Sequence, residues 1–300
     1  MTNLISIILS VYKEPVEYVR ESVESICAQT YLNWELIILI DDPSNLSVIN
    51  YLKAKKLKEK RIILCINEKN LGLVQSLNKG LSISRGDYIA RMDADDISLN
   101  NRLDVQLTYL RANSLDMVGS YYYIIDKLGQ KSSEVIKLPV SPQDCLRTLY
   151  HRNCIIHPSW FAKRQVFEDL CGYRDIDFAE DYDFLSRAII KGYRIGNCPQ
   201  PLLCYRFNSQ SISRTHTAEQ EYIARLVSQS LRRKQVLDIT TFRTFRSTEK
   251  YHRKVVKIEK TYKHLINLKQ GHYYSLLYLL FSSEFYRLLN NRIFFHIYSH

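Results

Sequence analysis

The sequence is poor in glycine, with nine in 300 residues, and this scarcity excludes a collagen-like or glycine-rich low-complexity chain. Neither of two common glycine-based phosphate-binding patterns occurs, because the chain contains no G-x-x-x-x-G-K-[ST] and no G-x-G-x-x-G. Their absence counts against a P-loop enzyme and against a Rossmann dehydrogenase. No internal repeat is present either.

Paired cysteines and long apolar runs are also missing. The seven cysteines include no C-x-x-C pair, which argues against a zinc site or a thioredoxin-like motif. Several lie in apolar segments, where a thiol packs as a small hydrophobe, so we expect a reducing cytoplasm and not secretion. No uncharged apolar run reaches the roughly 18 residues of a membrane span, and the N-terminal segment lacks the features of a signal peptide.

The positive charge is concentrated near the C-terminus. The chain has 42 Lys and Arg against 31 Asp and Glu, a net charge of +11. Residues 218–300 hold 15 basic and 6 acidic residues, a net of +9, so residues 1–217 contribute only +2. This distribution predicts a nearly neutral body followed by a basic region.

The first 112 residues alternate between short apolar runs and helical patterns. The expected strands are 4–11, 34–40, 61–67 and 87–92, and the expected helices are 15–29, 45–60, 73–84 and 99–112. This order predicts an α/β fold with a mostly parallel sheet and helices on both faces. The later part is less regular, and its expected elements are a hairpin from 116–126 and 132–139, helices near 141–150 and 178–191, short strands around two prolines in 194–207, and helices from about 217.

Acidic residues gather where the predicted parallel strands end. Asp41 follows the second strand, and Asp93, Asp95 and Asp96 follow the fourth. Ligands bind beyond the carboxyl ends of such strands, and carboxylates grouped there repel one another unless a cation compensates. Because Mg²⁺ binds carboxylates together with substrate phosphates, the pattern predicts a metal-bridged phosphate site. An ordinary loop, turn or helix cap is the alternative for each acid.

Four segments in order carry a resemblance to a known family. They read SVYKE, WELIILIDDPS, NLGLVQSLNKGLSISRGDYIARMDADD and AEDYDFLSRAIIKGY. Together they resemble family 2 glycosyltransferases of the GT-A fold, in the bacterial branch that builds capsular or lipooligosaccharide glycans from UDP-sugars. The resemblance implies a catalytic domain at 1–215, with a nucleotide-sugar half at about 1–112 and an acceptor half at about 113–215. It leaves 216–300 as a basic, aromatic-rich helical region.

The resemblance also implies which residues contact the donor. Those expected near the nucleoside are Val11, Tyr12, Glu14 and Asp41, of which Asp41 is similar to the residue that hydrogen-bonds uracil. In the D-x-D motif, Asp95 resembles the ligand of a divalent metal, Mn²⁺ or Mg²⁺, and Asp93 is expected near the ribose or sugar. The cations expected near the diphosphate or the donor sugar are Lys79, Arg91, Arg206 and Arg214. For Arg206 and Arg214, which lie in or beside a segment that resembles a closing loop, a solvated loop charge is the alternative.

The acceptor side carries the expected base. Asp181, in the pair Glu180-Asp181, resembles the catalytic base of inverting members, although both acids could simply complement a helix dipole. The base would take the proton of an acceptor hydroxyl as its oxygen attacks the anomeric carbon, so an α-linked UDP-sugar would give a β-linked product. Trp160 could stack on a sugar and His157 could contact phosphate or acceptor, or both could pack in the core.

The basic region allows more than one explanation. Residues 225–269 hold 13 of its 15 basic residues, and residues 271–298 hold nine aromatic residues and six leucines. Basic helices followed by an aromatic helix suit an anionic membrane surface, at the inner face of the plasma membrane, where a lipid-linked acceptor would lie. Packing of the apolar helix on the body, or a homo-oligomer, explains the apolar part equally well.

The resemblance therefore implies an inverting, metal-dependent transfer of a sugar, with GlcNAc or Gal favoured, from a UDP-sugar to a glycan hydroxyl in cell-surface polysaccharide synthesis. A nucleotidyltransferase would share the sheet and the metal site, but it needs a glycine-rich basic loop where this chain has SVYKEP. A nucleic-acid-binding protein would use the basic region, yet no RNP, zinc-finger or helix-turn-helix signature occurs.

Overall fold

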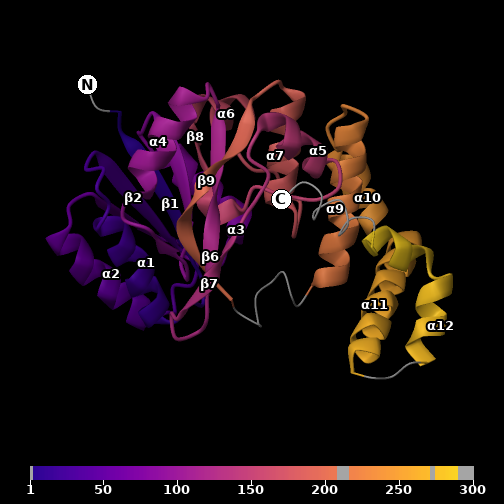
Figure 1. Ribbon diagram of the computed structural model, residues 1–300. Coiled ribbons are helices and arrows are strands. Elements are labelled where there is room, and N and C mark those ends of the chain that lie inside the picture. The colour runs from indigo at the N-terminus through magenta and orange to yellow at the C-terminus, as the bar shows by residue number, and fades with distance from the viewer. Residues whose placement is uncertain (1–2, 208–215, 271–273, 290–300) are drawn as a thin grey trace.

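A twisted sheet forms the centre of the computed structural model, which describes residues 3–207, 216–270 and 274–289 (Figure 1). Its strands are β1 (Ile5–Val11), β2 (Trp34–Ile40), β3 (Ile62–Ile66), β4 (Tyr88–Asp93), β5 (Ile97–Ser98), β6 (Met117–Ile125), β7 (Lys131–Ile136), β8 (Phe161–Lys163) and β9 (Ile195–Arg206). Their order is β3-β2-β1-β4-β8-β6-β9-β5, and β7 pairs with β6. The sheet thus joins both halves of the body.

Helices cover the sheet and extend beyond it. They are α1 (Val16–Cys27), α2 (Leu46–Lys58), α3 (Leu73–Ile83), α4 (Arg102–Ala112), α5 (Pro142–Leu149), α6 (Arg164–Asp169), α7 (Glu180–Ile190), α9 (Thr217–Arg232), α10 (Ile239–Arg246), α11 (Glu249–Lys269) and α12 (Tyr274–Phe281), with a 3-10 turn η1 (His157–Ser159). Side chains cap several of them, as Asn45 does for α2 and Ser141 for α5. The helices and strands predicted in the first 112 residues are confirmed to within a few residues.

The N-terminal half of the sheet is parallel, as predicted. Strands β3, β2, β1 and β4 all run in one direction, while β8 enters antiparallel between β4 and β6. Register fixes the strand ends: Val11 pairs with Ile40, and Ser10 pairs with Asp93. The residues that follow β1, β2 and β4 therefore meet at the same edge of the sheet.

Strand β9 differs from the prediction. The two prolines in 194–207 predicted short strands, but residues 195–206 form one strand beside β6. Its ladder jumps from Cys198, opposite Ser120, to Pro201, opposite Tyr121. Pro199 and Gln200 bulge out to solvent, so Pro199, which lacks an N–H, lies outside the hydrogen-bonded ladder.

Alternate residues of the central strands face two separate cores. Ile7, Leu36 and Ile38 pack with α1, α2 and α4 on one face, and Ile8 and Ile37 pack with α3, α6 and α7 on the other. This alternation is the period of two of a β-strand. Because both faces are covered, the strands read as continuous apolar runs, as in other buried parallel sheets.

The C-terminal helices join the second core. Ile223, Val227 and Leu231 on α9 are buried in it, and α9 packs on α7 (Figure 1). Helix α11 contacts α9 and α12, at the end of the molecule away from α1 and α2. The division of the chain at residue 215 stays a prediction, since the core continues across it. Of the aromatic residues counted in 271–298, Tyr273, Phe294, Phe295 and Tyr298 lie outside the described residues.

None of the helices among the described residues is long and apolar enough to cross a membrane.

Truncation of Leu231 tests whether α9 is part of the body. The side chain is 2% exposed, so Leu231→Ala should cost about 2–5 kcal/mol of the free energy of unfolding, measured by chemical denaturation. Leu57→Ala, at a leucine that is 73% exposed, should change it by less than about 0.5 kcal/mol. A Leu231→Ala protein whose main transition is unshifted would show that α9 unfolds independently of the sheet.

Candidate active site

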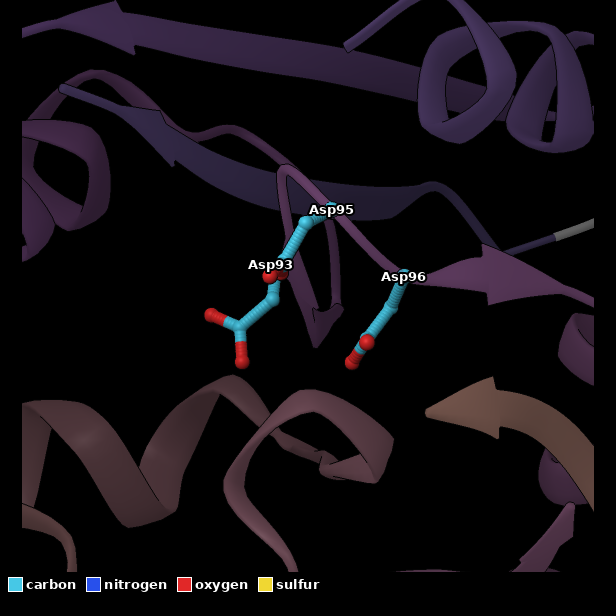
Figure 2. A group of neighbouring side chains, drawn as sticks. All are labelled: Asp93, Asp95 and Asp96. Atoms are coloured by element: carbon cyan, nitrogen blue, oxygen red, sulfur yellow. The ribbon is translucent and has the colours of Figure 1, made fainter. Parts of the chain in front are cut away.

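Three aspartates lie together just after β4. Asp93 ends the strand, and the N–H of Asp96 donates to the Asp93 carbonyl at 3.4 Å, closing a tight turn. One ligand atom from each of Asp93, Asp95 and Asp96 can be chosen so that all lie within 4.8 Å of one another. Figure 2 shows the three side chains extending from this turn toward the same side.

These carboxylates fit a hard divalent cation. One oxygen of Asp96, Oδ1, accepts from the Arg206 backbone N–H at 2.8 Å, while Oδ2 is buried and has no hydrogen-bond partner among the described residues. An unpartnered buried carboxylate oxygen is costly, and carboxylate oxygens are the ligands that Mg²⁺ prefers. The D-x-D resemblance points to Asp95 as the ligand and gives Asp96 no such role, although the run Asp93-Ala94-Asp95-Asp96 contains the signal.

The electrostatics of the turn are those of a site short of positive charge. Burial, together with the nearby charges of Asp93 and Glu14, raises the pKa of Asp95 to about 7. The pKa of Asp96 is also raised, chiefly by burial. Arg91 compensates in part through an ion pair of 2.5 Å with Asp93. A cation bound at the turn would relieve the remaining repulsion.

A second acidic pair faces this turn from α7. Asp181 lies in the first turn of that helix, where its Oδ1 accepts from the Tyr182 N–H at 2.6 Å and its Oδ2 from Asn153 Nδ2 at 2.8 Å. Burial raises the pKa of Asp181 to about 6, and Asp93 is among the charges that contribute. The pKa of Glu180 is raised more, by burial and by Asp181. The structure thus brings the predicted base close to the predicted D-x-D motif.

The residues after β2 form a hydrogen-bonded group. The Asp41 carboxylate accepts from the N–H groups of Leu71 and Gly72 and from Asn67 Nδ2, each at 2.8 Å. Gly72 has a φ of 83°, which its missing Cβ permits, and Lys79 Nζ donates to Asn67 Oδ1 at 2.7 Å. This network fixes Asp41 at the sheet edge, and the predicted roles of Asp41 and Lys79 toward the donor stay predictions.

The loop after β1 offers an aromatic ring. Tyr12 is 38% exposed, and its N–H donates to the Glu14 carboxylate at 2.6 Å. The Val11 side chain is fully buried in the core, so a nucleoside contact by Val11 would have to come from its backbone. Only the backbone of Val11 lies at the edge, where its carbonyl accepts from the Asp41 N–H at 2.7 Å.

Burial decides between the two alternatives for Trp160 and His157, and the prediction for Arg214 stays open. Trp160 is 0% exposed and donates to the Ile155 carbonyl, so it packs in the core and does not stack on a sugar. His157 contacts the Trp160 ring edge-on and hydrogen-bonds Tyr173, whose oxygen lies 2.9 Å from Nε2, an arrangement that also makes it structural. Arg214 lies outside the described residues.

Arg206 is likewise corrected, from a diphosphate ligand to a structural residue. Its side chain is 1% exposed. The guanidinium donates to the carbonyls of Asp95 and Asp126 and pairs with Glu21. These partners occupy the donors of the guanidinium, so Arg206 holds the backbone of the acidic turn in place.

Comparison with known proteins decides the family. A sequence model of the family described as Glycosyl transferase family 2 matches residues 6–171, more than half of the chain. The chain belongs to glycosyl transferase family 2. An uncharacterized glycosyltransferase of Methanocaldococcus jannaschii is 33% identical over 229 residues, 76% of each chain.

Two other similar proteins carry more specific names. The Escherichia coli enzyme WfgD, named a UDP-Glc:alpha-D-GlcNAc-diphosphoundecaprenol beta-1,3-glucosyltransferase, is 28% identical over 212 residues, 70% of this chain and 79% of its own. The crystal structure of S. aureus TarS 1-349 in complex with UDP-GlcNAc superposes with a TM-score of 0.61 at 16% identity, over 79% of this chain and 68% of that one. The predicted GT-A type of fold is confirmed, and the nucleotidyltransferase and nucleic-acid-binding alternatives are set aside.

Neutralising Asp95 in this glycosyltransferase should stabilise the metal-free protein. Because its pKa is raised in the folded state, the native protein holds a proton that the unfolded chain releases near pH 4, and stability falls as pH rises from there to about 7. At pH 8, Asp95→Asn should therefore raise Tm by about 2 °C or more, the shift of roughly 1 kcal/mol in a domain of 150–250 residues.

Two further measurements complete this test. Mn²⁺ should raise the Tm of the parent protein and have little effect on Asp95→Asn. The matched control is Glu259→Gln, which removes an exposed acid on α11 and should leave both quantities unchanged. A lower Tm for metal-free Asp95→Asn at pH 8 would contradict the repulsion.

Proposed function

We propose that this glycosyltransferase moves a sugar from a UDP-sugar to a hydroxyl of a glycan acceptor, with inversion at the anomeric carbon. The observation that carries the proposal is the placement of Asp181 close enough to the acidic turn for Asp93 to affect its pKa. A base on one side of a reacting sugar, and on the other a site whose bound cation would hold the leaving diphosphate, are what a single in-line displacement needs.

The donor and the acceptor are inferred from the named relatives. TarS binds UDP-GlcNAc in a structure of the same fold, and the name of WfgD gives UDP-Glc as donor and a diphosphoundecaprenol-linked acceptor. These names support a UDP-sugar and a lipid-linked acceptor in cell-surface polysaccharide synthesis. GlcNAc and Gal are the favoured sugars for this chain.

The proposed step is one displacement. The acceptor oxygen bonds to the anomeric carbon while the bond from that carbon to the diphosphate oxygen breaks, and its electron pair leaves with UDP. Asp181 takes the hydroxyl proton and later releases it to water. Because no covalent intermediate forms, an α-linked donor gives a β-linked product.

The remaining donor contacts are assigned by position. Tyr12 would face the base and Asp41 would hydrogen-bond it, while Lys79 and Arg91 would lie toward the diphosphate or the sugar. A divalent cation, Mn²⁺ or Mg²⁺, would be held by Asp95 with Asp93 and Asp96, and when bound it neutralises charge on the departing diphosphate.

Asp181→Asn tests the base. The amide cannot take a proton, so kcat should fall by about 10²–10⁴-fold, while the affinity for UDP with Mn²⁺, measured calorimetrically, should stay close to that of the parent. Turnover close to the parent rate would show that another group is the base.

Asp183→Asn is the matched control on the same helix. Asp183 is 1% exposed and pairs with Arg174 and Arg187, so this variant should lower Tm. The rate per folded molecule should change little, because Asp183 does not face the acidic turn.

We further propose that the far C-terminal helices contact an anionic membrane surface at the cytoplasmic side. Helix α11 holds seven basic and two acidic residues. On α12, Leu276, Leu280 and Phe281 are 45%, 47% and 87% exposed. Lys257 on α11 donates to Ser283 at 3.2 Å, so basic and apolar side chains come from adjacent segments, a combination that favours anionic lipid.

Vesicle sedimentation tests this second part. Binding to phosphatidylcholine vesicles that contain phosphatidylglycerol should exceed binding to pure phosphatidylcholine and should weaken with added salt. Phe281→Ser should reduce it several-fold, whereas Leu32→Ser, at an exposed leucine of the body, should not. Equal vesicle binding by Phe281→Ser would contradict the membrane contact. Dimers of the parent protein that Phe281→Ser abolishes would favour a homo-oligomer surface instead.

A further inference from the structure

Asn153 is the one side chain that the structure gives as a donor to the Asp181 carboxylate among the described residues. Its Nδ2 lies 2.8 Å from Asp181 Oδ2, and its Oδ1 accepts from the Ile155 N–H at 2.9 Å. The second bond fixes the orientation of the amide, because a backbone N–H can face only the oxygen end of the Asn side chain. The nitrogen is therefore the atom that faces Asp181.

The two oxygens of Asp181 are held by separate donors. Oδ1 accepts from the Tyr182 N–H of its own helix, and Oδ2 accepts from Asn153 on the loop between α5 and η1. Two donors from different segments fix the plane of the carboxylate. Each oxygen keeps a lone pair with which it can meet an acceptor hydroxyl.

The loop that carries Asn153 is held in turn by the C-terminal helices. Arg232 on α9 donates from Nε to the Tyr150 carbonyl at 2.7 Å, and its Nη2 lies 3.2 Å from His151 Nδ1. On the other side of Asn153, the Cys154 carbonyl accepts from Asn197 at 3.0 Å. Asn153 is thus bracketed by two attachments within a few residues.

The same helices also hold the segment that leads into α7. Gln220 on α9 donates to the Phe178 carbonyl at 3.1 Å, and Arg246 on α10 pairs with Asp177. Both contacts lie within four residues of Asp181. The C-terminal helices therefore contact both the loop that carries Asn153 and the segment that precedes Asp181.

We propose that Asn153 is a positioning residue for Asp181 and that Arg232 on α9 fixes the loop that presents it. The inference rests on the proposed function, in which Asp181 is the base. It assigns α9 and α10 to the catalytic unit, in a role separate from the membrane contact proposed for α11 and α12.

The decisive variant is Asn153→Asp. It keeps an oxygen for the Ile155 N–H, so the turn is preserved, and replaces the donor that faces Asp181 by an acceptor. We expect kcat to fall by about 10–100-fold, the usual effect of losing a group that orients a functional one, with KM for the UDP-sugar unchanged. The kcat of Asn153→Ser should fall as well. Because serine is uncharged and too short to reach Asp181, this variant separates the loss of the donor from the added charge of Asn153→Asp.

Two comparisons complete the design. Asn113→Asp, where the amide donates to a backbone carbonyl at an exposed helix end, is the matched control and should retain the parent kcat. Arg232→Gln should lower kcat, and combined with Asn153→Ser it should lower kcat little further, because two residues that act through one contact are not additive.

The outcomes separate this proposal from the proposed function. Parent-like kcat in Asn153→Ser, or a change confined to KM, would overturn the positioning role, as would full additivity with Arg232→Gln. An active Asp181→Asn would overturn the base assignment on which it rests. An inactive Asp181→Asn with slow but measurable Asn153→Ser would support both.

Discussion

The rest of the structure depends on holding several partly buried carboxylates close to one another at one edge of the sheet. Asp93, Asp95 and Glu14 interact across the ends of β1 and β4, and burial raises the pKa of Glu14 as well as that of Asp95. Repulsion within such a group destabilises the folded state unless nearby cations or hydrogen-bond donors compensate for it. Buried Arg91 pairs with Asp93. Buried Arg206 donates from its backbone N–H to the Asp96 carboxylate and from its guanidinium to the Asp95 carbonyl. What remains uncompensated faces the space that a metal–diphosphate group would fill.

An aromatic cluster in the second half of the body, residues 113–215, supports α7. The Trp160 ring packs against the rings of Tyr173 and Phe184, with centroids 6.1 and 5.4 Å away, and His157 joins Tyr173 by a hydrogen bond. Phe184 belongs to the first turns of α7, so this aromatic cluster fixes the helix whose N-terminus carries Asp181. Trp160 and His157, which were candidates for contact with the sugar or the phosphate, thus contribute indirectly by holding α7 in place.

The C-terminal helices divide into two parts with different chemistry. Helix α9 buries apolar residues in the core and reaches the loops on both sides of Asp181. Helices α11 and α12 carry the excess of positive charge and the exposed apolar side chains. The net charge of the chain therefore describes its outer helices and says little about the proposed reaction, in which an anionic donor would bind at an acidic turn.

The sequence by itself determined the elements and the edge at which the acids meet. The hydrophobic periods and the D-x-D spacing are local, and parallel strand ends converge whatever the loops do, so Asp41, Asp93 and Asp95 could be placed at one edge in advance. Asp181 could be named only through the family resemblance. Only the tertiary structure decided burial and partners. Val11, Trp160 and Arg206 have residue types that suit a ligand, but long-range packing buries them, while Asn153 and Arg232 carry no motif and gain meaning from segments far apart in the chain. Contacts between distant segments depend on how the sheet curls and the helices dock, which no local spacing encodes.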